Sequence, residues 1–456
     1  MPSIVTLNVS EQNAPNPNTL QKTVAFVSQG ATTNAVNSLT LLTASNSLAS
    51  MLTGSKSVTS LVGSAGMVTA TVPAHGIPVG DIIPITIAGC TSGSTVLNGT
   101  WNCTATTTTA FTFANAFSGT ATGTIVYTLE DVAELVQMNN TFWAQGSSVS
   151  VNVLELGITG LVDGPPALNT YIQANPLTVY VWLVPREWDG ATAFLALIAA
   201  YEAPTAMTYF FTTTTTGTYN DYTALMKCVF ALIEAPSLPT TEFTVASAMR
   251  AVASINPGSG NRVGPFAFTE VFGVTPYPVK GNSTLLTNLK TAATNVALIG
   301  SEGGLTNTFL YWGQSKDGND FEYWYSLDWI QINAKLVVAN EIIEGSNNKI
   351  NPLIYNQAGV DRLQDRLFNL LKQSVSNGLG NGTPVRTKLD FDGLVTAIDD
   401  GDFVGDLVVN AIPFQDYLNL NPSDYGTGTY NGLSLLYTPS RGFISILINL
   451  VAVNFG

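Results

Sequence analysis

Residues 60–128 contain no Lys, Arg or Glu and are dense in Thr, Gly and Ala. Short runs within them alternate apolar and polar residues, as in 68–72, 82–87 and 111–113. Such alternation, with Gly and Asn turns between the runs, is typical of short strands that bury one face. Helix-forming residues return from Leu129 onward. We therefore predict a small all-β, barrel-like module, inserted so that it splits a surrounding domain.

Strand and helix patterns alternate between about residues 161 and 300, which predicts an α/β layer with a central sheet. The near-continuous apolar run 178–184 indicates a strand that is buried on both faces. A further strand is expected at 207–211. Helices are expected at 191–201 and at 220–233, where Asn220 would cap the second helix.

The last third is predicted to begin with a hairpin, because the aromatic runs 309–312 and 323–327 flank the polar turn 315–320. A long helix follows at about 328–344, and its apolar residues suggest burial on more than one side. A second helix at 357–375 has leucines on one face and charged residues on the other.

The predicted fold class is a mixed α+β and α/β multidomain protein. Its regions are an N-terminal arm with the first part of a core domain (1–59), the inserted β-module (60–128), an α/β domain (129–300) and a C-terminal core domain (301–456). The core domain near the chain ends is expected to contain a mixed sheet, with one strand at 406–412 and a terminal strand arm.

Composition limits the possible functions. With 45% hydrophobic residues the chain can bury large cores, so it is not expected to be disordered. Its 17 Lys and Arg against 31 Asp and Glu give a net charge of −14. This argues against a nucleic-acid partner, because binding phosphates requires a surplus of cations. Neutral Thr, Ser, Asn and Gly must form much of the surface, which suits a protein that lies against other proteins.

Most catalytic and metal chemistry is excluded by a single histidine, His75, and three cysteines, Cys90, Cys103 and Cys228. His75 lies beside a turn in a block without a nucleophile motif, so we interpret it as a packing residue. The Gly-rich segments lack the residues that a phosphate loop requires. We predict no catalytic residue, no cofactor and no metal.

Three further features have both a binding and a structural interpretation. The turn 317–322 has the oxygen density of a calcium loop but lacks EF-hand spacing, and its residues also suit a hairpin turn. The acidic turn 399–402 is interpreted as solvated. Trp324, Tyr325 and Trp329 would form a sugar-binding platform if exposed and part of the core if buried.

Export and membrane insertion are not expected. Residues 1–20 have no basic start and no long apolar stretch, so they do not resemble a secretory signal. Apolar runs such as 443–453 are interrupted and too short to span a bilayer. The thiols are therefore expected to stay reduced, with a Cys90–Cys103 disulfide as the alternative.

Two features concern association. Both chain ends carry β-prone segments that can add a strand to a neighbouring subunit's sheet or pair within their own subunit, and the sequence does not decide between these. The residues of these strand arms are Ile4, Val5, Leu7, Val9, Phe443, Ile444, Ile446, Ile448, Leu450 and Val453. The charged face of helix 357–375, with Arg362, Arg366 and Lys372, can dock on an acidic partner or face solvent.

Several segments follow one another in a distinctive order. They run from Asp317-Gly318 through Tyr323-Trp324-Tyr325-Ser326-Leu327-Asp328-Trp329-Ile330-Gln331 to Gln357-Ala358-Gly359-Val360 and Gly442-Phe443-Ile444. This order, with Phe142-Trp143-Ala144-Gln145-Gly146 before the α/β domain, resembles contractile-tail sheath proteins of myophages and most closely a divergent sheath-like family. The resemblance covers most of residues 1–58 and 129–456.

The inserted block has a resemblance of its own. His75-Gly76-Ile77, Val79-Gly80-Asp81 and Leu97-Asn98-Gly99-Thr100 lie between its strand runs. Together they are similar to a small β-barrel module of phage structural proteins, which is likened to a half-domain of ubiquitin-activating enzyme. This resemblance implies a decoration without catalytic residues. Together with the sheath resemblance it implies a module on the exterior, with the core domain facing the tube.

The sheath resemblance implies six-membered rings of subunits, stacked helically around a tail tube in the virion after assembly in the host cytoplasm. The partners would be further copies of this chain, the tail tube protein, and baseplate and tail terminator proteins. The arms would donate strands to neighbours, contraction would need no nucleotide, and Arg362, Arg366 and Lys372 would contact the tube. The alternatives are another virion structural or decoration protein, or a carbohydrate-binding surface adhesin.

Overall fold

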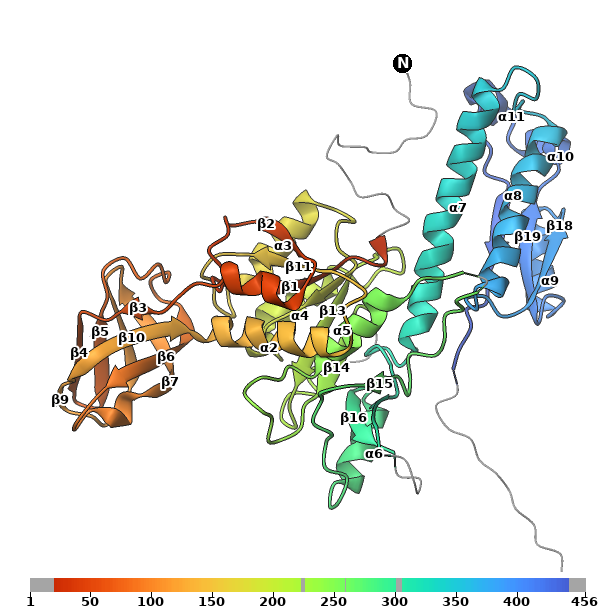
Figure 1. Ribbon diagram of the computed structural model, residues 1–456. Helices are drawn as coiled ribbons and strands as arrows, with labels where there is room; N and C mark the ends of the chain where they lie inside the picture. The colour runs from red at the N-terminus through yellow and green to blue at the C-terminus, as the bar shows by residue number, and fades with distance from the viewer. Residues whose placement is uncertain (1–19, 223–225, 259, 301–305, 443–456) are drawn as a thin grey trace, which may run out of the picture. The chain divides into compact units, whose positions relative to one another are not determined.

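The computed structural model describes residues 20–222, 226–258, 260–300 and 306–442 (Figure 1). These residues divide into two compact units, each built from separate stretches of chain. The large unit lies within 13–254 and 268–319, and the small unit contains 255–267 and the chain from 320 onward.

A nine-stranded sheet forms the centre of the large unit, in the order β15-β17-β16-β14-β13-β12-β1-β11-β2. Its parallel strands are β1 (Val24–Ser28), β11 (Val151–Glu155), β12 (Val181–Leu183), β13 (Tyr209–Thr214), β14 (Val229–Ile233) and β16 (Asn295–Ile299). The antiparallel strands are β2 (Ser38–Leu42), β15 (Glu270–Val271) and β17 (Thr308–Tyr311). Numbered along the chain, the parallel strands have the order 2-1-3-4-5-6 of a doubly wound fold. This confirms the predicted α/β layer with a central sheet.

Every residue of β1 is buried, although successive side chains of a strand point to opposite faces of its sheet. Both faces of the sheet are therefore covered. Ala25 and Val27 belong to the core that includes residues of α3 (Gly164–Ala174) and α4 (Thr192–Ala199). Phe26 points the other way and packs edge-on against Phe142 of α2 (Glu130–Ala144), with ring centroids 5.6 Å apart. The remaining helices of the unit are η1 (Ser45–Ser50), η2 (Thr95–Leu97), η3 (Arg186–Trp188), α5 (Val245–Ser254) and α6 (Ser283–Thr291).

The helix expected at 220–233 is wrong. Its second half is the strand β14, which pairs with β13 and β16 and is buried at all five positions. Periodicity alone cannot distinguish a short apolar run in a helix from a strand that is buried on both faces. Neighbouring strands on either side decide the outcome here.

Residues 56–129 form an antiparallel sheet of eight strands, in the order β3-β10-β6-β7-β8-β5-β4-β9. The strands are β3 (Lys56–Ser57), β4 (Ser60–Ser64), β5 (Met67–Thr71), β6 (Ile82–Cys90), β7 (Gly99–Thr107), β8 (Ala110–Ala114), β9 (Gly119–Thr120) and β10 (Gly123–Leu129). Their inward residues form a separate apolar core. The predicted all-β character is confirmed. Because the pairings of the described residues leave β3 and β9 as ends of the sheet, closure into a barrel stays a prediction.

The small unit packs two long helices beside a three-stranded sheet. Helix α7 (Phe321–Asn347) contacts α8 (Gln357–Ser376), and α8 covers the sheet. Gln364 of α8 is buried there and donates to the carbonyl oxygens of Thr387 (2.7 Å) and Val409 (2.9 Å). The remaining elements are β18 (Thr383–Thr387), α9 (Phe391–Asp399), β19 (Asp406–Ala411), α10 (Phe414–Leu420), α11 (Pro422–Thr427) and β20 (Leu433–Leu436).

The hairpin expected around 315–320 is also wrong. Residues 308–311 form β17 of the large sheet, whereas 323–327 lie in the first turns of α7. Buried residues at Phe321, Trp324, Tyr325 and Trp329 recur at helical spacing, so packing along one face outweighs the strand preference of aromatic residues. Among the described helices, none combines the length and the apolarity that crossing a membrane requires.

Candidate functional site

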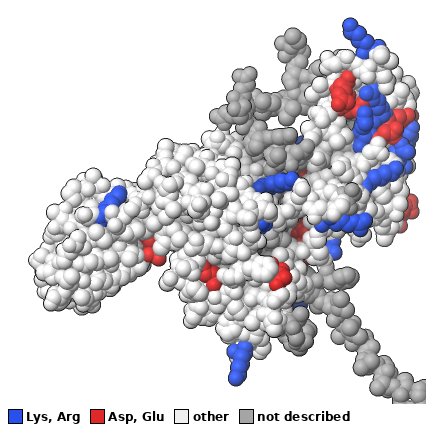
Figure 2. Space-filling model, viewed as in Figure 1, with Lys and Arg blue, Asp and Glu red and all other residues white. Residues whose placement is uncertain are grey.

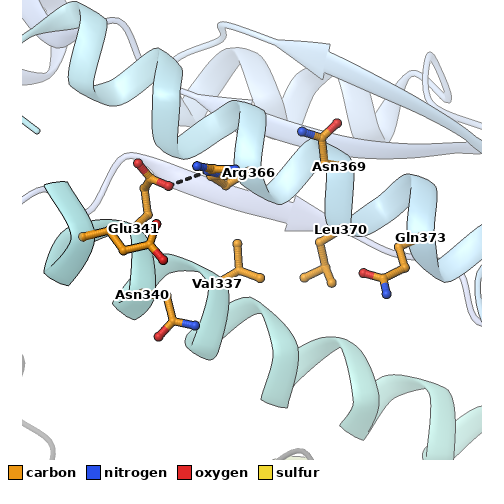
Figure 3. Close-up of a pocket in the computed structure, with 8 residues that line it drawn as sticks. Val337, Asn340, Glu341, Arg366, Asn369, Leu370 and Gln373 are labelled. Atoms are coloured by element: carbon orange, nitrogen blue, oxygen red, sulfur yellow. Dashed lines mark hydrogen bonds and ion pairs between the residues drawn. The ribbon is translucent and has the colours of Figure 1, made fainter. Parts of the chain in front are cut away.

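The contact between α7 and α8 contains the charged residues that the sequence singled out. Glu341 of α7 is almost fully buried and forms ion pairs with both Arg362 and Arg366 of α8. Figure 3 shows the pair with Arg366. Arg362 also donates to the carbonyl oxygen of Asn351, at 2.9 Å. Lys372 lies over the ring of Phe368, with its Nζ 4.3 Å from the ring centroid. The two arginines therefore hold α7 to α8 through one shared carboxylate, which balances one of their two positive charges.

A hollow of about 260 Å³ lies between the same two helices (Figure 3). Val337 and Leu370 supply its apolar surface. The remaining lining residues are Asn340, Glu341, Glu344, Arg366, Asn369 and Gln373. The lining offers amides and charged groups but no thiol, hydroxyl or imidazole. Its only groups that could act as a nucleophile or as an acid or base are the carboxylates of Glu341 and Glu344, and Glu341 is engaged in ion pairs with two arginines.

The three-stranded sheet has the order β18-β19-β20, with β19 in the centre. In the described residues, β18 and β20 each pair on one side only, β18 in parallel and β20 antiparallel to β19. The outer edges therefore present main-chain N–H and C=O groups that an additional strand can pair with.

Main-chain hydrogen bonds hold the last described residues of the small unit. The Asn381 N–H donates to the carbonyl oxygen of Thr438, and the Ser440 N–H donates to that of Leu379. Gly442 then donates its N–H to Glu322 Oε1 at 3.1 Å, at the start of α7. Burial raises the pKa of Glu322 to about 7. The predicted strand-arm residues, from Ile4 to Val9 and from Phe443 to Val453, lie outside the described residues.

His75 is placed as the sequence indicated, against a turn. It is fully buried, its Nδ1 accepts from the Ile77 N–H (3.0 Å), and its Nε2 donates to the carbonyl oxygen of Thr107 (2.8 Å). Both ring nitrogens are therefore used in holding local structure. Cys90 and Cys103 of the same module are free thiols, so the alternative disulfide does not form.

The other candidate residues serve the fold. Asp317 accepts both the main-chain and the side-chain N–H groups of Asn319, at 3.0 and 2.9 Å, so its carboxylate organises a turn. In the described residues no group of His, Cys, Asp and Glu is arranged to hold a metal ion. Trp324, Tyr325 and Trp329 are buried and belong to the core rather than to a sugar-binding surface.

Polar groups at the carboxyl ends of the parallel strands were not identified from the sequence. A ligand of a doubly wound sheet binds where the strand order reverses, here between β1 and β12. At this edge Glu155 accepts five hydrogen bonds. Arg186, just after β12, makes a two-point contact with Glu234 at 2.8 and 3.0 Å. The polar groups are thus engaged with one another.

Three carboxyl groups close to this edge, two of them buried and that of Glu187 partly buried, have too few cations to balance them. Burial raises the pKa of Glu134 and of Glu187 to about 7, and for Glu187 the nearby Glu134 adds to the effect. Burial also places the pKa of Asp131 well above its ordinary value, and the neighbouring Glu187, Glu134, Glu155 and Glu130 act in the same direction. Arg186 opposes the shift at Glu134.

These raised pKa values predict that the large unit is less stable in alkaline than in acidic solution. In the unfolded chain the carboxyls ionise near their ordinary pKa, whereas the folded chain favours the neutral form. The stabilisation that the folded chain gains from keeping these carboxyls neutral is therefore complete below about pH 4, and it is lost as the pH rises through 7. We expect the free energy of unfolding to fall by about 3 kcal/mol between pH 5 and pH 8.

Thermal unfolding followed by circular dichroism across this pH range would measure the effect. The double substitution Asp131→Asn with Glu187→Gln should reduce the dependence to the part that Glu134 contributes, because neutral amides no longer ionise. Glu270→Gln, at an exposed position of β15, is the matched control and should keep it. A wild-type protein that is equally stable at pH 5 and pH 8 would contradict this account.

Comparison with known proteins gives matches only at the level of structure. No protein-family model matches the sequence, and no curated protein is significantly similar to it. The sheath tail protein Lin1278 from Listeria innocua is similar with a TM-score of 0.41 and 11% identity, over 94% of this chain and 99% of that one.

Two further neighbours come from the anti-feeding prophage in its contracted state. A chain of the helical sheath has a TM-score of 0.45 and 14% identity, over 87% of this chain and 95% of that one. A chain of the baseplate structure has a TM-score of 0.46 and 11% identity, over 99% of this chain and 98% of that one.

Proposed function

We propose that this chain is a structural subunit of a bacteriophage contractile tail sheath. Copies of it would polymerise as stacked hexameric rings around the tail tube and contract to drive the tube through the host envelope. The observation that carries the proposal is the sheet β18-β19-β20, whose two outer edges are open in the described residues. An open-edged sheet next to a β-prone chain end is what joining subunits by exchanged strands requires.

The strand arms supply the donors in this proposal. The N-terminal arm contains Ile4, Val5, Leu7 and Val9, and the C-terminal arm contains the alternating residues from Phe443 to Val453. Main-chain hydrogen bonds would join neighbouring subunits whatever the charge of their surfaces. This suits a chain with a net charge of −14, whose subunits repel one another at long range.

The further partners follow from the same assembly. They are the tail tube, the baseplate and the tail terminator, with the protein located in the virion after assembly in the host cytoplasm. Of the residues proposed for the tube contact, Arg362 and Arg366 are paired with Glu341. Lys372 forms no ion pair with the described residues, so its ammonium group is the cation proposed to contact the tube. The module 60–128 would be a decoration of the particle.

Negative-stain electron microscopy of the purified full-length protein tests the proposal. We expect tubes or stacked rings, because the donor and acceptor strands belong to the same chain. Sedimentation of the same sample should show particles far heavier than the 48.2 kDa subunit. A folded protein that stays monomeric at every concentration, and in particular one that binds glycans, would refute a sheath function.

A further inference from the structure

The two edges of the sheet β18-β19-β20 differ in what they offer to an added strand. In β18 the Thr383 N–H donates to the carbonyl oxygen of Gly405 at 2.9 Å, so Thr383 directs its main-chain groups toward β19. Because successive residues of a strand direct these groups to opposite sides, Pro384 and Arg386 direct theirs to the outer edge. Proline has no N–H, so this edge lacks a hydrogen-bond donor at Pro384.

Charged side chains accompany this proline. Arg386 pairs with Asp365 of α8, and Lys388, just beyond β18, pairs with Asp361 of the same helix. All four side chains are about half exposed, so these ion pairs lie at the surface. In Figure 2 the charged atoms are concentrated over the small unit, where Figure 1 shows α8 beside β18. Proline and charged side chains are features that keep an edge strand from pairing with another chain. The edge of β18 is therefore poorly suited to receive a strand.

The edge of β20 keeps its donors. The Ile412 N–H donates to the carbonyl oxygen of Gly432 at 3.0 Å, so Gly432 directs its main-chain groups toward β19. By the same alternation, Leu433 and Leu435 direct theirs to the outer edge. Each of these two residues offers both an N–H and a C=O. The sequence from 425 to 440 contains no charged residue. This edge is therefore suited to strand addition.

The same edge continues beyond β20 and ends at a proline. Thr438 and Ser440 make main-chain hydrogen bonds of 2.9 and 2.7 Å with residues 379–381, so both face inward. Tyr437 and Pro439 therefore face outward. Tyr437 adds a third donor and acceptor to the edge, whereas Pro439 offers no N–H. The chain's own continuation, folding back as a hairpin, would meet this interruption first. A strand from another copy can pair along 433–437 without meeting it.

The C-terminal arm has a composition that fits this edge. Residues 443–456 contain no proline and no charged residue. Fully extended, these fourteen positions span about 46 Å, whereas 433–437 takes up about 17 Å. Enough chain therefore remains to pass from one subunit to the next. The N-terminal arm fits less well, because residues 1–19 include three prolines and Glu11.

We propose that the C-terminal arm of one copy of this chain adds as a strand to the outer edge of β20 in another copy, rather than to that of β18. The main-chain groups of Leu433, Leu435 and Tyr437 join the two copies. Because donor and edge are both uncharged, the contact brings no further like charges together in a chain with a net charge of −14. Donor and acceptor are different surfaces, so the contact continues from copy to copy. The inference rests on the proposed sheath function and assigns the two partners of one of its contacts.

Two matched proline substitutions in the full-length protein test which edge accepts the strand. Leu435→Pro removes an outward N–H from β20, and Arg386→Pro removes one from β18. Because both N–H groups point away from β19, neither substitution breaks a main-chain hydrogen bond within the subunit. We expect assembly to need about a hundredfold more Leu435→Pro protein than wild-type protein, because the added strand loses a hydrogen bond and meets the proline ring. Arg386→Pro should assemble like the wild type.

A control and the outcomes separate this contact from the sheath proposal. Leu435→Ala loses the side chain but keeps the N–H, so it should assemble like the wild type. Circular dichroism of each variant reports whether the subunit folds. If Leu435→Pro assembles like the wild type, or if Arg386→Pro prevents the assembly of folded subunits, the edge assignment is wrong while the sheath proposal stands. If the wild-type protein does not assemble, both are wrong.

Disulfide trapping identifies the donor without a proline. One population carries Ser434→Cys, at a position that would face an added strand in a pair without main-chain hydrogen bonds, where the two Cα atoms lie close together. A second population carries one substitution from the series Ile444→Cys to Leu450→Cys. The native thiols Cys90, Cys103 and Cys228 are buried. Oxidising the assembled mixture should give disulfide-linked dimers that contain one chain of each kind.

The cross-links that form distinguish this contact from its alternatives. A link from Ser434→Cys to a chain of the series Ile4→Cys to Val9→Cys would place the N-terminal arm at this edge. A link within one monomeric chain that carries both Ser434→Cys and a substitution in the C-terminal arm would show that the arm pairs with its own subunit. Either result, or the absence of any link in the assembled mixture, would overturn the assignment.

Discussion

A chain that ends at Gly442 is expected to fold and to remain a monomer. The described residues of the small unit make extensive contacts with one another: α8 covers the sheet, and Gly442 donates to Glu322 at the start of α7. Removing the last fourteen positions takes away a proposed donor strand and leaves the acceptor edge of β20 without that partner. We expect the large particles to disappear from sedimentation and electron microscopy, with the circular dichroism of the folded subunit retained.

A pair of substitutions separates strand donation from the mere presence of the segment. Ile446→Pro with Ile448→Pro removes two main-chain donors and should abolish assembly like the truncation, because proline cannot complete a ladder of hydrogen bonds. Ile446→Val with Ile448→Val retains the donors and the preference for strand conformation. This matched variant should assemble normally. Polymers formed by the truncated chain would show that the C-terminal arm does not join the subunits.

Replacing Glu155 by alanine is expected to lower the free energy of unfolding of the large unit by about 4 kcal/mol, or the melting temperature by about 10 °C. Glu155 is 1% exposed. Its Oε1 accepts from the N–H groups of Gly30 and Gly157, both at 2.7 Å. Its Oε2 accepts from the Ser28 hydroxyl at 2.6 Å and from the hydroxyl and N–H of Thr32 at 2.7 and 3.0 Å. Alanine would leave all these donors buried without an acceptor.

The backbone around Glu155 cannot easily rearrange to compensate. Gly30 and Gly157 have φ values of 86° and 81°, and a Cβ on Gly30 would lie 2.5 Å from Ile158 Cγ1. Glu155→Gln keeps the shape but turns an N–H₂ group toward these donors, so an intermediate loss is expected. Glu270→Ala, at an exposed position of the same unit, should change little. Thermal and denaturant unfolding would measure all three, and an unaltered Glu155→Ala protein would contradict this role.

The sequence predicted those elements whose determinants are local. The alternation in 68–72 and 111–113 appears as β5 and β8, and the leucine face of 357–375 as the buried side of α8. It failed at 220–233 and 323–327, where short apolar and aromatic runs suit either structure. There the choice depends on neighbours that are distant in the sequence: β16 for the first run and the buried face of α7 for the second.

Long-range partners also explain what was missed in the candidate sites. Four of the five hydrogen bonds to Glu155 come from Ser28, Gly30 and Thr32, more than 120 positions away, and no local motif announces them. The charged face of α8 was recognised, but its partner Glu341 lies on another helix among apolar residues. Similarly, exposed apolar residues of α9 have the periodicity of a buried face, and only the structure shows which residues of this helix point outward.

The parallel pairing of β1 with β11 has a consequence for how the chain is made. Ser28 and Glu155 lie opposite each other but are 127 positions apart. At about 5–20 residues per second, a ribosome needs about 6–25 s to extend the chain from one to the other. The strands of the eight-stranded module emerge during this interval and pair with near neighbours in the sequence, so they can fold at once. Meanwhile β1, apolar on both faces, waits for its partner, and nascent chains are open to aggregation or chaperone capture at this segment.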